Sequence, residues 1–88
     1  MSSKLYIDVR HPSEIAGKKI KGVELYPYVK ILEDKESFYE FCAKASEVVL
    51  ICRSGRRSAL VRAMLLAKGM DAVETRTPKA VRKVLEDE

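Results

Sequence analysis

The sequence predicts an α/β fold, in which a small, open and mostly parallel sheet of about four strands is flanked by helices. Short runs rich in β-branched and aromatic residues alternate with helical patterns along the chain. Residues 47–52, Glu-Val-Val-Leu-Ile-Cys, are almost entirely apolar, as in a central strand that is covered on both faces. At 88 residues, 47% hydrophobic and 34% charged, the chain can bury one core, so we expect a single domain over residues 1–88.

Two strands are predicted near the start of the chain. Residues 5–9 form a β-branched and aromatic run whose carboxyl end carries Asp8 and Arg10. Residues 23–26 form a second short run, which Pro27 closes because proline cannot donate a hydrogen bond to a sheet. Functional sites of open α/β sheets collect at the carboxyl ends of the strands, where Asp8 and Arg10 are expected.

A helix is predicted between the second and third strands. Ser37 and Glu40 form a capping box, and apolar residues follow at helical spacing as far as Ala45. Cys42 lies on this apolar stripe. We therefore interpret Cys42 as core packing, with a resolving thiol as the alternative.

In the second half of the chain, the sequence pattern predicts a strand, a polar loop, a helix, a further strand and a last helix. A helix rich in Ala, Leu and Met covers residues 58–68, and Gly69 ends it. Residues 70–74 form the last strand. Thr77 then caps a final helix that has Pro78 at its first position.

Cys52 ends the central strand directly before the polar loop and the helix. Unpaired backbone N–H groups at a helix amino terminus stabilise a thiolate, as do nearby guanidinium groups. We expect a lowered pKa for Cys52 and a nucleophile suited to an anionic substrate or an anionic bound sulfur, with a buried structural cysteine as the alternative. The expected substrate-binding residues are those of the loop: Arg53, Ser54, Gly55, Arg56 and Arg57.

Several segments together resemble the rhodanese-like sulfurtransferase family, in its single-domain type. Residues 5–14, LYIDVRHPSE, are similar to the opening signature of that family, an aspartate-variable-arginine triplet followed by a glutamate. Residues 20–27, IKGVELYP, are similar to its next segment, and residues 52–58, CRSGRRS, to its active loop. Residues 69–73, GMDAV, resemble the turn into its last strand. Motifs in this order are more specific than the cysteine loop alone.

The resemblance implies a parallel sheet with the strands in the order last, third, first, second. It implies that Cys52 accepts a sulfane sulfur as a persulfide, that the loop N–H groups hold this sulfur and that Arg57 closes the loop. Asp8 and Arg10 are then supporting residues with no chemical step. The implied donor is a small anion such as thiosulfate or a persulfide, and a sulfur-acceptor protein is a further expected partner. No cofactor is implied.

Two other functions stay open on the sequence. Cysteine phosphatases and arsenate reductases share the cysteine loop, but five residues separate their nucleophile from the arginine. The position six places after Cys52 is occupied by Ser58, so Arg57 comes one residue too early for that class. A non-catalytic binding module of rhodanese type is the other hypothesis, and the presence of Cys52 counts against it.

Composition excludes several other classes. Two cysteines and His11 cannot complete a zinc shell, so we expect no metal. No apolar run approaches the roughly 20 residues needed to cross a bilayer, and no targeting segment is visible, so we expect a cytoplasmic protein without a membrane partner. The net charge is +4, but lysines and arginines are spread among 13 acids, so nucleic acid is not an expected partner. Asn and Gln are absent, as in many heat-adapted chains.

Two further polar features of the sequence are interpreted without a chemical role. His11 precedes Pro12 and is interpreted as a surface turn residue, with an acid or base over the pocket as the alternative. Lys18, Lys19 and Lys21 are interpreted as a solvated loop, with docking of an acidic protein partner as the alternative.

Overall fold

The computed structural model describes residues 3–15 and 17–86 and contains one parallel sheet. The strands are β1 (Lys4–Asp8), β2 (Glu24–Leu25), β3 (Glu47–Ile51) and β4 (Val73–Arg76), in the order β2-β1-β3-β4. Every neighbouring pair is parallel. This confirms the predicted sheet and the strand order last, third, first, second.

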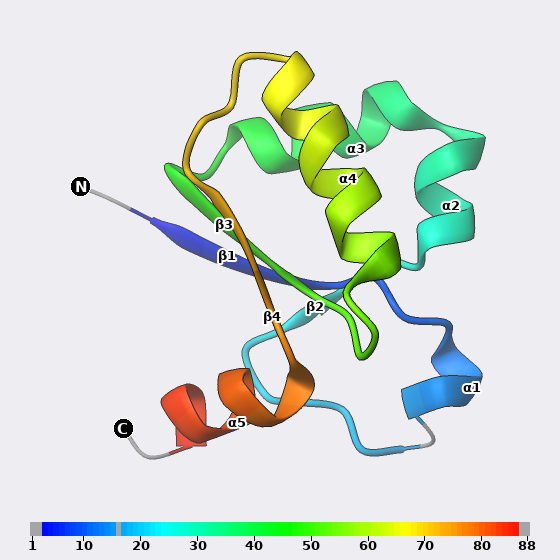
Figure 1. The fold of residues 1–88 in the computed structure, drawn as a ribbon, viewed down its shortest axis with the longest axis vertical. Coiled ribbons are helices and arrows are strands. Elements are labelled where there is room, and N and C mark those ends of the chain that lie inside the picture. The colour runs from blue at the N-terminus through cyan, green and yellow to red at the C-terminus, as the bar shows by residue number, and fades with distance from the viewer. Residues whose placement is uncertain (1–2, 16, 87–88) are drawn as a thin grey trace.

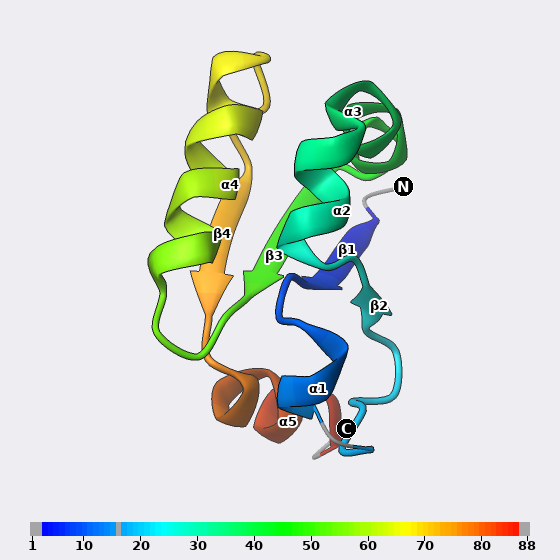
Figure 2. The same cartoon turned by 90° about the vertical axis from the view of Figure 1, so that its right-hand side faces the viewer.

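Five helices connect or follow the strands in the described residues. They are α1 (Pro12–Ile15), α2 (Tyr28–Glu33), α3 (Lys35–Ala43), α4 (Arg56–Ala67) and α5 (Pro78–Glu86). Figure 1 shows α2, α3 and α4 together on one side of the strands, and α1 and α5 on the other side. The same division is clear in the rotated view of Figure 2. None of these helices combines the length and the apolar composition needed to span a membrane.

The central strand β3 divides the core into two layers because its side chains alternate between the faces of the sheet. Val48 and Leu50 pack into the larger core, which buries residues of α2, α3 and α4. Val49 and Ile51 pack into the smaller core with Val81 of α5. An apolar run of strand length is therefore covered on both faces, as predicted.

Several predicted boundaries differ from the structure. The capping box of Ser37 and Glu40 is wrong, because α3 begins at Lys35 and the side chain of Asp34 accepts a hydrogen bond from the Ser37 backbone N–H at 3.1 Å. The last strand starts at Val73, three residues later than expected. The short helices α1 and α2 were not predicted.

The amino terminus of α5 agrees with its prediction. The helix begins at Pro78, and the backbone N–H of Ala80 donates to the Thr77 side-chain oxygen at 3.2 Å. This bond satisfies one of the amide groups that the first helical turn leaves free. Because Thr77 directly follows β4, the cap also fixes where α5 leaves the carboxyl edge of the sheet.

Candidate active site

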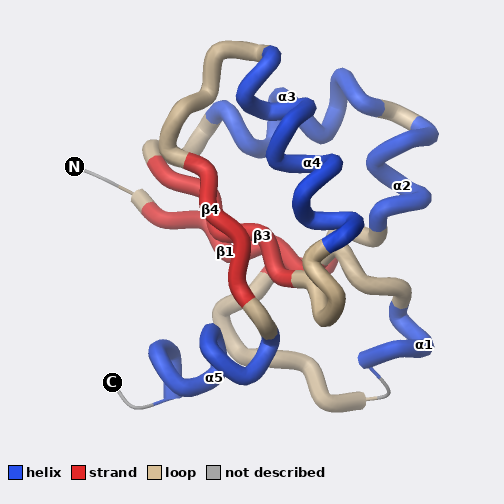
Figure 3. Tube along the Cα trace, viewed as in Figure 1, coloured by secondary structure: helices blue, strands red, loops and turns tan. Residues whose placement is uncertain are grey.

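Cys52 lies immediately after β3, at the carboxyl edge of the sheet. Its backbone N–H donates to the carbonyl of Arg76 at 3.2 Å, which joins it to the end of β4. The residue is only 2% exposed. Figure 3 shows the short loop after β3 turning directly into α4. The nucleophile predicted from the sequence therefore stands between a buried strand and a helix amino terminus.

Gly55 makes the tight turn into α4. It precedes the first helical residue and has φ of 79°, in the left-handed region that side chains with a Cβ disfavour. The Ser58 hydroxyl donates to the Gly55 carbonyl at 3.2 Å and secures the turn from inside the helix. This conformation bends the loop so that its amide groups face the sulfur of Cys52.

The pKa of Cys52 lies below its ordinary value because two opposing effects do not cancel. Burial disfavours the thiolate and is the largest single effect. Backbone hydrogen bonds from Ser58, Gly55 and Arg57 and the side chain of Ser54 lower the pKa, and the net shift is downward. The Ser54 oxygen lies 3.9 Å from the sulfur. The chain thus stabilises a thiolate at Cys52 mainly with neutral N–H groups.

Cys42 has the opposite environment. It is fully buried in the larger core, and burial raises the pKa of its thiol to about 12. A thiol with this pKa stays protonated and is a poor nucleophile near neutral pH. The structure agrees with the interpretation of Cys42 as core packing.

Cys52 opens into a cavity of about 180 Å³. One wall is the active loop together with Ser58, and the other comes from residues 75–77 at the end of β4. Sequence reasoning did not identify this second wall. The signal for it is the register of the sheet, which pairs Arg76 with Ile51 and so brings residues 75–77 beside the loop. The lining residues are Cys52, Arg53, Ser54, Gly55, Ser58, Thr75, Arg76 and Thr77.

Asp8 and Arg10 form a buried ion pair beside the loop. Arg10 Nε lies 2.9 Å from Asp8 Oδ1, and Arg10 Nη2 lies 2.8 Å from Oδ2. The residues are 3% and 8% exposed. The hydrogen bonds to Asp8 raise the pKa of Arg10, and the negative charge of Cys52 adds to this. The pair brings a fixed cation near the nucleophile.

Arg57, the closing arginine of the loop, is held by Glu14 of α1. Its Nη1 and Nη2 lie 2.6 and 2.7 Å from the two carboxylate oxygens, so the contact is bidentate. Glu14 Oε1 also accepts the His11 backbone N–H at 3.0 Å. These contacts, that with Arg57 first, lower the pKa of Glu14 to about 2. The bond to Glu14 raises the pKa of Arg57, and Cys52 adds charge and a hydrogen bond in the same direction.

Glu14 is a residue to which sequence reasoning gave no role. It closes the motif of residues 5–14, but helix α1, which positions it, has only four residues and no amphipathic pattern to predict it. His11, by contrast, lies where it was interpreted: it is exposed, with its Nδ1 2.7 Å from the Ser13 hydroxyl oxygen.

The two other loop arginines are exposed. Arg53 lines the cavity, whereas Arg56 begins α4 and does not line it. Neither forms a salt bridge with a carboxylate among residues 3–15 and 17–86. Their charges therefore project into solvent, unlike those of Arg10 and Arg57.

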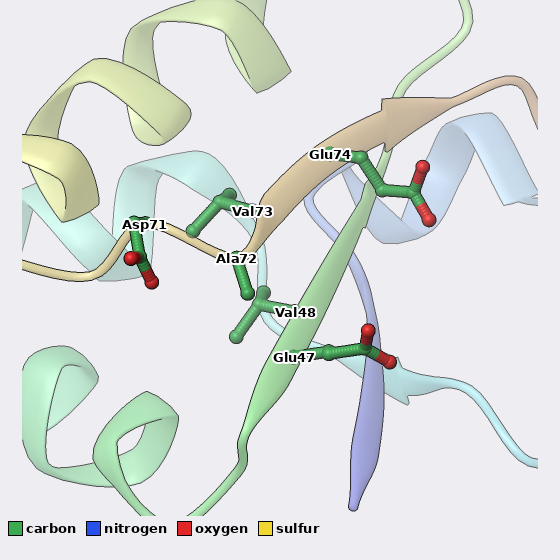
Figure 4. A pocket seen from close by; sticks show the side chains of 6 residues that line it. All are labelled: Glu47, Val48, Asp71, Ala72, Val73 and Glu74. Atoms are coloured by element: carbon green, nitrogen blue, oxygen red, sulfur yellow. The ribbon is translucent and has the colours of Figure 1, made fainter.

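A second hollow lies at the opposite end of the sheet. Figure 4 shows that Glu47, Asp71 and Glu74 line it and that the Asp71 carboxylate points away from the other two. Within the described ranges, no group of three or more His, Cys, Asp or Glu side chains is placed to hold a metal ion. No cysteine lines this hollow, and the candidate nucleophile Cys52 lies at the opposite edge of the sheet.

An all-parallel sheet with a cysteine at its carboxyl edge, facing a helix amino terminus, defines an α/β domain with a candidate cysteine site. A family model for the rhodanese-like domain matches residues 1–77 of the 88-residue chain, and the chain belongs to this family. The match supports the sulfurtransferase superfamily in general, a group that also includes non-catalytic members. No curated protein and no solved structure matches the chain.

Proposed function

We propose that the protein is a sulfurtransferase in which Cys52 carries sulfur as a persulfide between a small anionic donor and a nucleophilic acceptor. The observation that carries the proposal is the ring of N–H groups from Gly55, Arg57 and Ser58 around a sulfur with a lowered pKa. Such a ring stabilises either a thiolate or the terminal sulfur of a persulfide.

The reaction has two displacements. The Cys52 thiolate attacks the outer sulfur of thiosulfate, the bond between the two thiosulfate sulfurs breaks, and sulfite leaves with the electron pair. The new bond joins Cys52 Sγ to the transferred sulfur, which carries the negative charge. An acceptor nucleophile then attacks this outer sulfur, and Cys52 leaves as the thiolate. No net oxidation occurs over the two steps.

The positions of the charges suit this reaction. The exposed cation Arg53 lines the cavity and attracts the anionic donor. The N–H groups lie at the sulfur itself, where negative charge is present before and after each displacement. Arg57 and Arg10 are restrained by their carboxylate partners, and the bond from Arg57 to Glu14 ties the loop to α1. The cavity of about 180 Å³ is lined by polar groups suited to a small oxyanion.

A phosphatase or arsenate reductase is the rival activity. Such an enzyme needs an arginine whose guanidinium faces a tetrahedral oxyanion. The closing arginine here, Arg57, instead directs both terminal nitrogens at Glu14, and the position six places after Cys52 is Ser58. These contacts favour sulfur transfer over phosphoryl transfer.

Mass spectrometry of the intact protein after incubation with thiosulfate tests the proposal. We expect a gain of one sulfur atom, located on Cys52 by peptide mapping and removed by cyanide or a reducing thiol. The Cys52→Ser variant should gain none, whereas Cys42→Ser should behave as the parent because that thiol is buried and protonated.

Three results would decide against this assignment. Sulfur on Cys42 would exchange the roles of the two cysteines. Hydrolysis of aryl phosphates through Cys52 without persulfide formation would favour the phosphatase. Absence of both activities would leave a non-catalytic binding module.

We also place the protein in the cytoplasm. Both cysteines are free thiols, and a cysteine nucleophile needs a compartment that keeps it reduced. Fractionation of cells that express the protein tests this placement.

A further inference from the structure

Unpaired positive charge extends from the Cys52 loop over the side of the molecule that carries α1 and α5. Figures 1 and 2 show α1, α5 and the loop between α1 and β2 on this side, opposite α2, α3 and α4, with the loop after β3 next to it. Seven exposed cations of these segments and of the first turn of α4 form no salt bridge with a carboxylate among residues 3–15 and 17–86. We call them the basic rim: Lys18, Lys19, Lys21, Arg53, Arg56, Lys79 and Lys83.

Of the carboxylates near this rim, two already have cationic partners, and Glu24, which lines a surface hollow with Lys19 and Lys21, forms no salt bridge among residues 3–15 and 17–86. Asp8 pairs with Arg10 and Glu14 with Arg57. Among the described residues of the rim segments, cations without a carboxylate partner therefore outnumber carboxylates without a cationic partner.

The lysine loop is anchored to the same framework as the site. Arg82 of α5 donates from Nη2 to the Lys18 carbonyl at 3.0 Å. Between Lys19 and Lys21, Ile20 is buried in the smaller core with Val81 of α5. The two lysines are thus presented from a backbone that is fixed at both sides, which reduces the entropy lost when a partner binds.

We propose that the acceptor of the Cys52 persulfide is a thiol carried by an acidic protein segment that docks along the basic rim. The proposal rests on the proposed sulfurtransferase function. The acceptor thiolate attacks the outer sulfur, a new S–S bond forms on the acceptor, and the bond to Cys52 breaks with its electron pair returning to Cys52. The acceptor leaves as a persulfide, and the cysteine is regenerated.

Carboxylates of a protein partner match the basic rim better than a nucleic acid does. Proteins that bind single strands combine cations with aromatic side chains on which bases stack. The segments of the rim, residues 17–22, 53–57 and 78–86, contain no aromatic residue. The aromatic rings that contact one another, Tyr26, Phe38, Tyr39 and Phe41, belong to the side of the sheet that carries α2 and α3.

Sulfur transfer to three short synthetic peptides tests the proposal. Each peptide contains one cysteine, flanked by glutamates, by serines or by lysines. The protein is first loaded with thiosulfate, and transfer is followed by loss of sulfur from Cys52 in the mass spectrum. We expect the acidic peptide to react about tenfold faster than the serine peptide at low salt, with the advantage lost at high salt. The lysine peptide should be slowest.

Charge-reversal variants locate the effect. Lys19→Glu with Lys21→Glu should remove most of the advantage of the acidic peptide. The control is Lys35→Glu with Lys44→Glu, which changes net charge by the same amount at exposed positions on α3 and its end. The control should keep the advantage. Both variants should still load sulfur from thiosulfate, because none of these lysines lines the Cys52 cavity.

The outcomes separate this proposal from the function on which it rests. Equal rates for the acidic and serine peptides, or equal losses in both variants, would overturn the docking surface while leaving the persulfide intact. A single-stranded RNA that inhibits transfer more strongly than a thiol-free acidic peptide at physiological salt would assign the rim to nucleic acid. If no persulfide forms, sulfurtransferase activity fails, and fluorescence anisotropy of the labelled acidic peptide still tests the rim.

Discussion

Replacing Glu14 by Gln removes the charge that holds Arg57 while keeping the size of the side chain. In the native protein both terminal nitrogens of Arg57 contact the carboxylate, at 2.6 and 2.7 Å. Gln offers one oxygen and an NH₂ group, so the bidentate pair cannot form. The substitution should loosen helix α1 from the active loop and destabilise the fold.

The size of the effect follows from the pKa of Glu14. A fall from the ordinary 4.5 to about 2 corresponds at face value to about 3 kcal/mol of stability. Solvent screens the pair, because the side chains of Arg57 and Glu14 are 31% and 34% exposed. We therefore expect about 1 kcal/mol at pH 7, which lowers Tm by about 4–8 °C in a domain of this size.

The dependence on pH distinguishes this pair from a general loss of packing. Because the folded protein lowers the pKa of Glu14, the stabilisation is complete above pH 4.5 and is lost as pH falls from there towards 2. The gap in stability between the parent and Glu14→Gln should close over the same range. Urea unfolding at several pH values measures it. A gap that stays constant from pH 7 to pH 2 would refute the argument.

Two further substitutions test other contacts of the site. Arg57→Ala should raise the pKa of Cys52, because it removes a cation and a side-chain hydrogen bond from the thiolate; the pH profile of iodoacetamide alkylation measures this, and identical midpoints in the two proteins would contradict it. Asp8→Ala should cost about 3–5 kcal/mol in urea unfolding, since Arg10 is left buried without its partner; a cost below about 1 kcal/mol would mean that Arg10 reaches solvent.

The sheet was predictable because each strand carries its own pattern. Residues 47–52 are apolar throughout, and the structure buries β3 on both faces. The short helices were not predictable for a physical reason. A helix such as α2, of six residues, is not stable alone, and it is held by burial of Ile31 in the larger core. The start of α3 was also not predictable from the sequence, because Asp34 and Ser37 are both good helix caps, and only packing decides between them.

The surroundings of Cys52 within its own loop were predictable from local sequence, but its contacts with distant segments were not. Cys52 and its loop are contiguous, so the approach of the amide groups to the sulfur follows from a strand, a glycine turn and a helix. Contacts between distant segments depend on the register of the sheet and on short helices. Glu14 reaches Arg57 across 43 positions of sequence, and the wall at residues 75–77 depends on the pairing of Ile51 with Arg76.

The arginines near Cys52 divide into two groups with different physical effects. Arg10 and Arg57 each engage a carboxylate with two hydrogen-bonded nitrogens, so much of their charge is offset, and Arg57 also ties the loop to α1. Arg53 and Arg56 are exposed, and their field extends into solvent, where salt screens it. The amide groups that lower the pKa of Cys52 act at short range and carry no net charge. Salt should therefore weaken the approach of an anionic partner far more than it changes the nucleophile that the partner meets.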